Sequence, residues 1–119
     1  MPDADAIVVF ITAPNREEAR RLAEMLVQAY LAACVQILPE IESTYRWQGN
    51  VERQPEVLLI AKTVQSRFDE LQSRVRALHS YETPEIVAVP VVECSNPYLE
   101  WLVNSIEVPA EPVASAPSD

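Results

Sequence analysis

Hydrophobic and polar positions repeat with two different periods in the first part of the chain. Residues 6–13 form an uninterrupted apolar run rich in β-branched side chains, which is typical of a buried central strand. Asn15 and Glu18 follow with the three-residue spacing of a helix capping box. Apolar residues then recur every three or four positions, which predicts a helix with an inner face formed by Ala19, Leu22, Ala23, Leu26 and Tyr30.

The middle of the chain predicts a long hairpin. Residues 33–47 have the pattern of an extended strand that bends at Pro39, and residues 51–63 form its return strand. Gly49 lies in the turn between them, where a positive φ favours glycine.

The remainder of the chain predicts a second helix, a fourth strand and a short C-terminal helix. A second helix is predicted to begin at Ser66, with an apolar stripe formed by Phe68, Leu71, Val75 and Leu78. Residues 85–93 are apolar almost throughout and predict a fourth strand. Asn96 precedes Pro97 as a helix N-cap and predicts a short C-terminal helix over residues 97–104.

The predicted order is β-α-β-β-α-β followed by a short helix. This order is that of the split βαβ or ferredoxin-like arrangement, an α+β fold in which two helices cover one face of a four-stranded antiparallel sheet. We expect a single domain over residues 5–106. Residues 107–119 are rich in proline and small side chains without periodicity, so we expect a disordered tail there.

Composition and charge exclude several classes of function. The 119 residues include one glycine, so a glycine-rich phosphate loop or dinucleotide fingerprint cannot be present. A formal net charge of −9 disfavours binding to nucleic acids and to anionic membranes. The first residues lack a basic start and a long apolar stretch, so we expect a cytoplasmic protein whose two cysteines are reduced.

The length of the hairpin predicts an oligomer. A strand over residues 33–47 reaches roughly 50 Å, whereas a domain of this size is about 35 Å across. The hairpin therefore overhangs its own core, and its far end carries Tyr45, Trp47 and Val51. An isolated ribbon is barely stable in water and has free edges. We expect other copies of the chain to cover it in an assembly with closed cyclic symmetry.

Candidate ligand-binding residues gather after the second predicted helix. His79, the only histidine, suits a metal ion or a small effector, or alternatively caps the end of the helix. Tyr81, Glu82 and Glu85 would line a polar cleft for a cationic or hydrogen-bonding ligand, and a solvated loop is the alternative. Lys62 would form a salt bridge with Glu82 or Glu85, or contact an anionic effector.

The cysteines and the lone histidine give no support for catalysis. Cys34, at the start of the hairpin, is expected to pack as a small buried side chain, with metal ligation as the alternative. Cys94 ends the fourth predicted strand and receives no specific role. No spacing recommends a Ser–His–Asp triad or a Cys–His pair, so we do not expect an enzyme.

Six short strings stand out by their order and spacing. They are ITAPN at 11–15, LAACVQ at 31–36, STYRWQG at 43–49, LLIAKT at 58–63, HSYETPEIVAVPV at 79–91 and PYLEWL at 97–102. Together they resemble the CutA family of divalent-cation tolerance proteins, and the resemblance covers nearly the whole predicted domain.

The resemblance implies a compact homotrimer, similar in architecture to the PII signalling proteins, and a link to copper and other divalent metals. The positions proposed as copper ligands in the family correspond to Ile11, Leu78 and His79 of this chain. Two of these are aliphatic and cannot ligate a metal, so we expect at most weak binding of Cu²⁺ or another divalent cation through His79, and no required cofactor.

Two functions from different classes remain open. The first is a homotrimeric protein of divalent metal tolerance that binds metal. The alternative is a PII-like regulator that binds a small effector or a protein partner in clefts between subunits and has no tight copper site.

Overall fold

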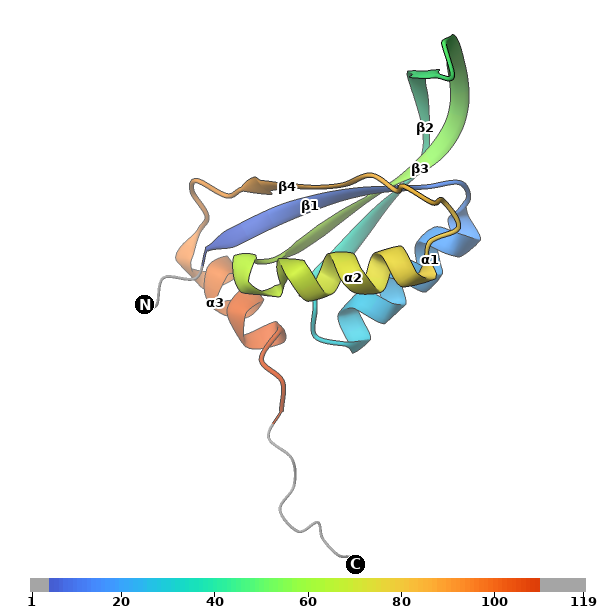
Figure 1. Ribbon diagram of the computed structural model, residues 1–119. Helices are drawn as coiled ribbons and strands as arrows, with labels where there is room; N and C mark the ends of the chain where they lie inside the picture. Colours follow the sequence, from blue (N-terminus) through green and yellow to red (C-terminus); the bar gives the residue numbers. More distant parts are fainter. Residues whose placement is uncertain (1–4, 110–119) are drawn as a thin grey trace, which may run out of the picture.

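The computed structural model of the protein describes residues 5–109, which form one sheet and three α-helices (Figure 1). The elements in chain order are β1 (Ala6–Ala13), α1 (Arg16–Gln28), β2 (Cys34–Trp47), β3 (Asn50–Val64), the 3₁₀ turn η1 (Gln65–Arg67), α2 (Phe68–Leu78), β4 (Ile86–Pro90) and α3 (Asn96–Ser105). All strand pairs are antiparallel, and the order across the sheet is β2-β3-β1-β4. The predicted α+β, ferredoxin-like arrangement is therefore confirmed.

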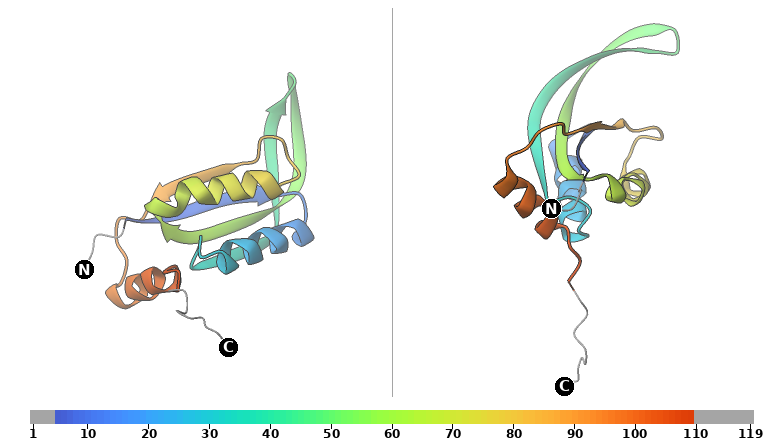
Figure 2. Two further views of the ribbon diagram at one scale, coloured as in Figure 1. Left: turned by 60° about the horizontal axis from the view of Figure 1, so that its bottom comes forward. Right: turned by 90° about the vertical axis from the view of Figure 1, so that its left-hand side faces the viewer.

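Alternation along the two central strands decides which face of the sheet is buried. Val9 and Ile11 on β1 lie opposite Ala61 and Leu59 on β3, and all four side chains are fully excluded from solvent. Both α1 and α2 lie against this face (Figure 2) and complete the core with Leu22, Leu26, Leu71 and Val75. Because side chains in a strand alternate, the intervening residues of β1 and β3 point to the opposite face.

The first helix begins where the sequence predicts, but it ends earlier. The side-chain oxygen of Asn15 accepts the backbone N–H of Glu18 at 2.8 Å, which is one half of the predicted capping box. Tyr30, predicted to lie on the helix, follows its end with a φ of 60°. There the N–H of Leu31 donates to the carbonyl of Leu26, as in a Schellman cap, at 2.9 Å. Tyr30 therefore adopts a left-handed backbone conformation that is usually occupied by glycine.

The hairpin of β2 and β3 extends well beyond the helices (Figures 1 and 2). The pairing register shifts between Leu38 and Ile41, at the proline that predicted a bend, and the ribbon curves away from the sheet there. The radius of gyration is 16.7 Å and the longest extent is 58 Å, against about 13 Å for the radius of a compact chain of about 100 residues. The predicted overhang is therefore confirmed.

The fourth strand is shorter than the predicted 85–93, and it ends early because β1 offers no further partners at its first residue. β4 pairs with β1 from Ile86 opposite Ile11 to Pro90 opposite Ile7. β1 starts one residue earlier, at Ala6, whose carbonyl accepts the N–H of Val91 at 3.0 Å. Beyond that bond the chain has no strand beside it and turns toward α3.

Two predicted helix starts are wrong by one or two residues. Ser66 does not cap the second helix; β3 instead runs on to Val64, and the chain enters α2 through η1 without a side-chain cap. The cap of α3 is Ser95, whose hydroxyl accepts the N–H of Tyr98 at 3.4 Å, and the predicted cap Asn96 is the first helical residue. Serine and asparagine are comparable caps, so neighbouring candidates are difficult to separate by sequence.

The last helix forms a small second cluster at the end of the sheet away from the hairpin (Figure 1). Leu102 and Ile106 pack with Ala33 and Val64, and all four are buried. Within residues 5–109, none of the helices is both long and apolar enough to span a membrane. The predicted tail, 107–119, lies outside the described residues from position 110 onward.

The hairpin turn generates a testable prediction. Gln48 and Gly49 both have a positive φ, of 51° and 84°, as a two-residue type I′ turn requires. A Cβ added at Gly49 would meet no atom within 4 Å, so backbone conformation alone opposes a side chain there. We expect Gly49→Ala to lower the free energy of unfolding by about 1–2 kcal/mol, measured by urea denaturation at a fixed protein concentration.

The matched change is Gln48→Gly, which relieves the strain at the neighbouring position. It should leave stability unchanged or raise it. Equal stability of Gly49→Ala and the wild type would contradict this account of the turn.

Candidate functional site

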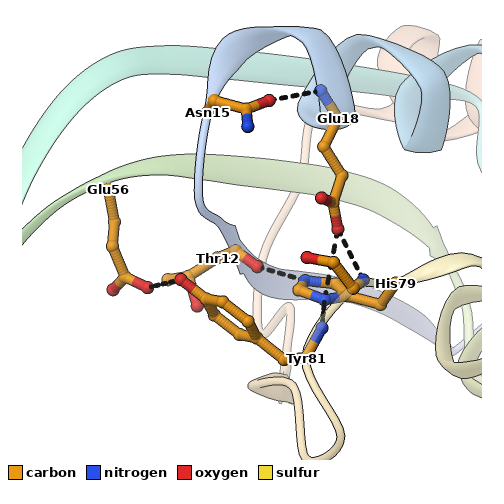
Figure 3. Close-up of polar contacts among 7 residues, drawn as sticks. Thr12, Asn15, Glu18, Glu56, His79 and Tyr81 are labelled. Atoms are coloured by element: carbon orange, nitrogen blue, oxygen red, sulfur yellow. Dashed lines mark hydrogen bonds and ion pairs between the residues drawn. The ribbon is translucent and has the colours of Figure 1, made fainter.

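A network of polar side chains lies where the hairpin leaves the sheet (Figure 3). Its centre is His79, which follows the last turn of α2 and is 8% exposed. The imidazole Nε2 is 2.7 Å from the carbonyl oxygen of Thr12, and Nδ1 accepts the backbone N–H of Tyr81 at 3.0 Å. A carbonyl can only accept, so the contacts assign the proton to Nε2. The histidine thus joins the end of β1 to the loop after α2.

Glu18, at the start of α1, approaches the same ring and is 4% exposed. Its Oε2 accepts the N–H of Ser80 at 2.8 Å and lies 3.3 Å from Nδ1 of His79. The sequence predicted Glu18 only as a capping residue. Its spacing of four residues before Leu22 places it on the buried side of α1, and that spacing could have indicated a tertiary role.

Tyr81 connects the network to the hairpin. Its hydroxyl donates to Oε2 of Glu56 at 2.7 Å, and its ring lies 4.8 Å from that of His79, tilted by 46°. Burial raises the pKa of Tyr81 well above its ordinary value, and the hydrogen bond and charge of Glu56 raise it further. Glu56 pairs with Ile41, the first residue of β2 after the register shift. The tyrosine therefore stays a hydroxyl donor and holds the root of the hairpin.

The other predicted cleft residues do not join this network. Glu82 and Glu85 are exposed, on the loop between α2 and β4. The predicted salt bridge of Lys62 with either of them is wrong, because its Nζ donates to Oε1 of Gln36 at 2.8 Å. Lys62 pairs with Val8, four residues along β1 from Thr12, and so lies far along the sheet from the loop.

The cysteines lie near α3. Sγ of Cys34 is 3.8 Å from the hydroxyl oxygen of Tyr98, and both cysteines are half-buried free thiols. Burial raises the pKa of Tyr98 to about 12, with a further contribution from the contact with Cys34. Cys34 is thus more exposed than the buried packing role predicts, because β2 is an edge strand.

The three positions that correspond to copper ligands in the family fall in different environments. Ile11 is fully buried in the core, Leu78 is 44% exposed on α2, and His79 is buried. Within residues 5–109, no three side chains of histidine, cysteine, aspartate or glutamate are grouped so that they could hold a metal ion.

The face of the sheet opposite α1 and α2 is apolar, and we call it the open face. Three of its side chains are well exposed: Leu38 at 42%, Val87 at 49% and Val89 at 39%. The register places these three on the same face as half-buried residues of the central strands, namely Val8, Phe10, Leu58 and Ile60.

The predicted interface residues at the far end of the hairpin are also exposed. Tyr45, Trp47 and Val51 are exposed at 42%, 60% and 65%. Tyr45 and Trp47 share one side of the ribbon, and Val51 lies on the other, opposite Arg46.

Proteins of known fold and name resemble this chain over most of its length. The divalent-cation tolerance protein CutA of Thermus thermophilus is 52% identical over 95 residues, which are 80% of this chain and 92% of that protein. The structure of the periplasmic divalent cation tolerance protein CutA from Archaeoglobus fulgidus is similar with a TM-score of 0.84 and 39% identity. This similarity covers 86% of this chain and 99% of that one.

A chloroplastic relative corrects the predicted location. The chloroplastic protein CutA of Arabidopsis thaliana is 51% identical over 100 residues, and the match spans 84% of this chain but 55% of the plant protein. With chloroplastic and periplasmic relatives, the prediction of a cytoplasmic protein is wrong. The physical reason is that the compartment depends on addressing segments read by receptors, while the shared domain carries only the fold.

The family assignment agrees with the order of short strings noted in the sequence. The family model for the CutA1 divalent ion tolerance protein matches residues 7–105, which include all three helices and all four strands apart from the first residue of β1. The chain therefore belongs to the CutA1 family of divalent ion tolerance proteins.

Proposed function

We propose that the protein is a homotrimer that contributes to divalent-cation tolerance by binding, not by catalysis. The observation that carries the assembly is the open face, where Leu38, Val87 and Val89 are exposed on a sheet whose other face is covered by helices. A contiguous apolar surface of this kind is characteristic of an interface. The number three comes from the resemblance to the CutA family.

The hairpin supports the same proposal by its geometry. It projects from the subunit with aromatic side chains at its tip, and a two-stranded ribbon is only marginally stable without cover. If each hairpin lies against the next subunit, the contacts are heterologous and close into a ring. In such a ring, neighbouring subunits cover both the open faces and the hairpins.

The polar network supports a role without catalysis. The chain has one histidine, and its ring nitrogens are used by the carbonyl of Thr12 and the N–H of Tyr81. A general base needs a nitrogen that can reach a reacting group. A residue that joins three segments of the fold in this way stabilises them instead.

We propose that divalent metals bind weakly to this chain. To coordinate Cu²⁺ through Nδ1, His79 would have to give up the N–H of Tyr81, because that atom's lone pair already accepts it. The cost of this exchange opposes binding. Cys34, the other candidate ligand, lies beside Tyr98 and not beside the histidine.

The alternative is a PII-like regulator that binds a small effector between subunits. The observation in its favour is the loop that carries Glu82 and Glu85, exposed side chains on a segment anchored by His79 and Tyr81. Such a loop suits a cationic or hydrogen-bonding ligand. Native mass spectrometry of the purified oligomer should then detect a retained small molecule, and an oligomer that carries none would count against this alternative.

The proposed assembly predicts that substitutions on the open face and hairpin, but not on the helical side of the subunit, change the mass of the oligomer. Wild type should have three times the 13.3 kDa mass of one chain by light scattering coupled to size exclusion. Val89→Glu and Trp47→Glu should each shift the mass toward one chain, because a buried unpaired carboxylate is costly. The matched control is Val27→Glu on α1, a valine with a similar exposed fraction of 42% on the helical side.

Circular dichroism distinguishes dissociation from unfolding, because a variant that only dissociates should retain the spectrum of its helices and strands. A wild-type mass of one chain at micromolar concentration would contradict the proposal. Equal masses for the variants Val27→Glu and Val89→Glu would also contradict the proposal.

The copper proposal generates a second prediction. Cu²⁺ titrated into the wild type by calorimetry should bind weakly, and His79→Gln should weaken binding further. Glutamine keeps an amide donor for the carbonyl of Thr12 and so favours retention of the fold. Glu24→Gln, an exposed change on α1 outside this loop, is the control and should leave the titration unchanged. Tight binding that persists in His79→Gln would contradict the proposal and would indicate Cys34 or Cys94 as the ligands.

A further inference from the structure

A hollow of about 310 Å³ lies beside α3, at the end of the sheet away from the hairpin (Figure 1). Its walls come from three segments of the chain: the residue before β1, the passage from β3 into α2, and the end of α3. The N–H of Gln65 donates to the carbonyl of Asp5 at 2.8 Å and so holds the first segment against the second. The hollow is thus formed within one subunit, and its volume is at the lower end of the range for small-molecule sites.

Among the described residues that line this hollow, Arg67 is the only basic one. Its Nη2 donates to the carbonyl of Ile106 at 2.7 Å, a contact that caps the end of α3. A guanidinium has five N–H groups, and within residues 5–109 the Nε of Arg67 is buried without a hydrogen-bond partner. Capping α3 therefore accounts for only part of the donor capacity of Arg67, and the remainder suits a carboxylate.

Two acidic residues, Asp5 and Glu107, line the same hollow, and both are exposed. In the described part of the chain, neither forms an ion pair with Arg67. Groups of opposite charge therefore face one small space without neutralising each other directly. A simple anion in this space would be attracted by the guanidinium and repelled by the carboxylates, and a simple cation would meet the reverse. A zwitterion, which carries both charges, finds a partner for each.

The rest of the lining is largely aliphatic. Val64 and Ile106 are buried members of the small cluster beneath α3, and Val103 packs against that cluster half-buried. All three residues line the hollow beside the charged groups. An aliphatic group of a ligand would cover this surface and remove it from water, which favours binding.

We propose that this hollow binds an aliphatic α-amino acid as its zwitterion. The carboxylate of the ligand accepts from the guanidinium of Arg67, and its ammonium group lies beside Asp5 and Glu107. Its side chain lies against the three aliphatic residues of the lining. Because the hollow belongs to one subunit, this site does not depend on the number of subunits and goes beyond the function proposed above.

Nuclear magnetic resonance of the isotope-labelled full-length protein tests the site with L-leucine. Concentrations up to about 10 mM are needed, because so small a ligand gains limited binding free energy. The amide signals of residues 64–67 and 103–107 should shift together and saturate, whereas those of residues 80–85 should not move. The amide of leucine lacks the carboxylate, and 4-methylpentanoate lacks the ammonium group. Each should therefore bind about tenfold more weakly or worse.

Three variants assign the binding to the charged groups. Arg67→Gln removes the guanidinium but keeps an amide donor for the carbonyl of Ile106, and it should raise the Kd for L-leucine about tenfold or more. Glu107→Gln is an exposed change that leaves this capping contact intact, and it should also weaken binding. The matched control is Arg76→Gln, which removes the same charge from an exposed position on α2 outside the hollow and should leave the Kd unchanged.

The absence of a saturable shift with L-leucine would overturn the proposal, as would either analogue binding as tightly as L-leucine. Unchanged binding by Arg67→Gln would also overturn it. If Arg67→Gln does not fold, Glu107→Gln decides the matter, and an unchanged Kd for that variant contradicts the proposal. Shifts centred on residues 80–85 would place the ligand in the loop after α2 instead and would equally rule out the hollow.

Discussion

The pairing of β1 with β4 ends at Ile11, one residue before Thr12. The imidazole of His79 provides the hydrogen-bond donor for the carbonyl oxygen of Thr12. A buried backbone acceptor left without a partner costs as much as a lost hydrogen bond, so this contact constrains several elements at once. It places the end of α2 next to the end of β1. It also sets the course of the loop that leads into β4, and it brings Glu18 of α1 and Tyr81 into the same network. A residue that at first suggests a metal ligand thus has a structural task in this subunit.

The second constraint is the imbalance between the two faces of the sheet. One face is covered by α1 and α2, and the residues beneath them are fully buried. The other carries exposed valine and leucine side chains and the half-buried Phe10, and the hairpin that continues past the domain carries exposed side chains as well. Both features leave apolar surface in contact with water, and a large exposed apolar patch is characteristic of an interface. The acidic surface charge does not oppose this, because the open face is largely uncharged apart from Lys62 and Glu56 on β3.

These two constraints meet at the root of the hairpin. Glu56 lies opposite Ile41, immediately after the register shift where the ribbon turns away from the sheet, and Tyr81 donates to it. The polar network and the overhanging hairpin are therefore connected by a single hydrogen bond. Loops on a rigid sheet are where function is commonly placed, and this junction lies beside the loop that carries Tyr81.

The periodicity of the sequence by itself determined the order of the elements, the buried face of α1 and the bend and overhang of the hairpin, because these follow from local spacing, from proline and from strand length. The strings of residues determined the family. Only the tertiary structure decided the partners of the polar side chains, since Glu18 and His79 lie 61 positions apart in sequence and meet through the packing of α1 against the end of α2. It also decided where β4 ends, because a strand extends only as far as its neighbour offers backbone partners.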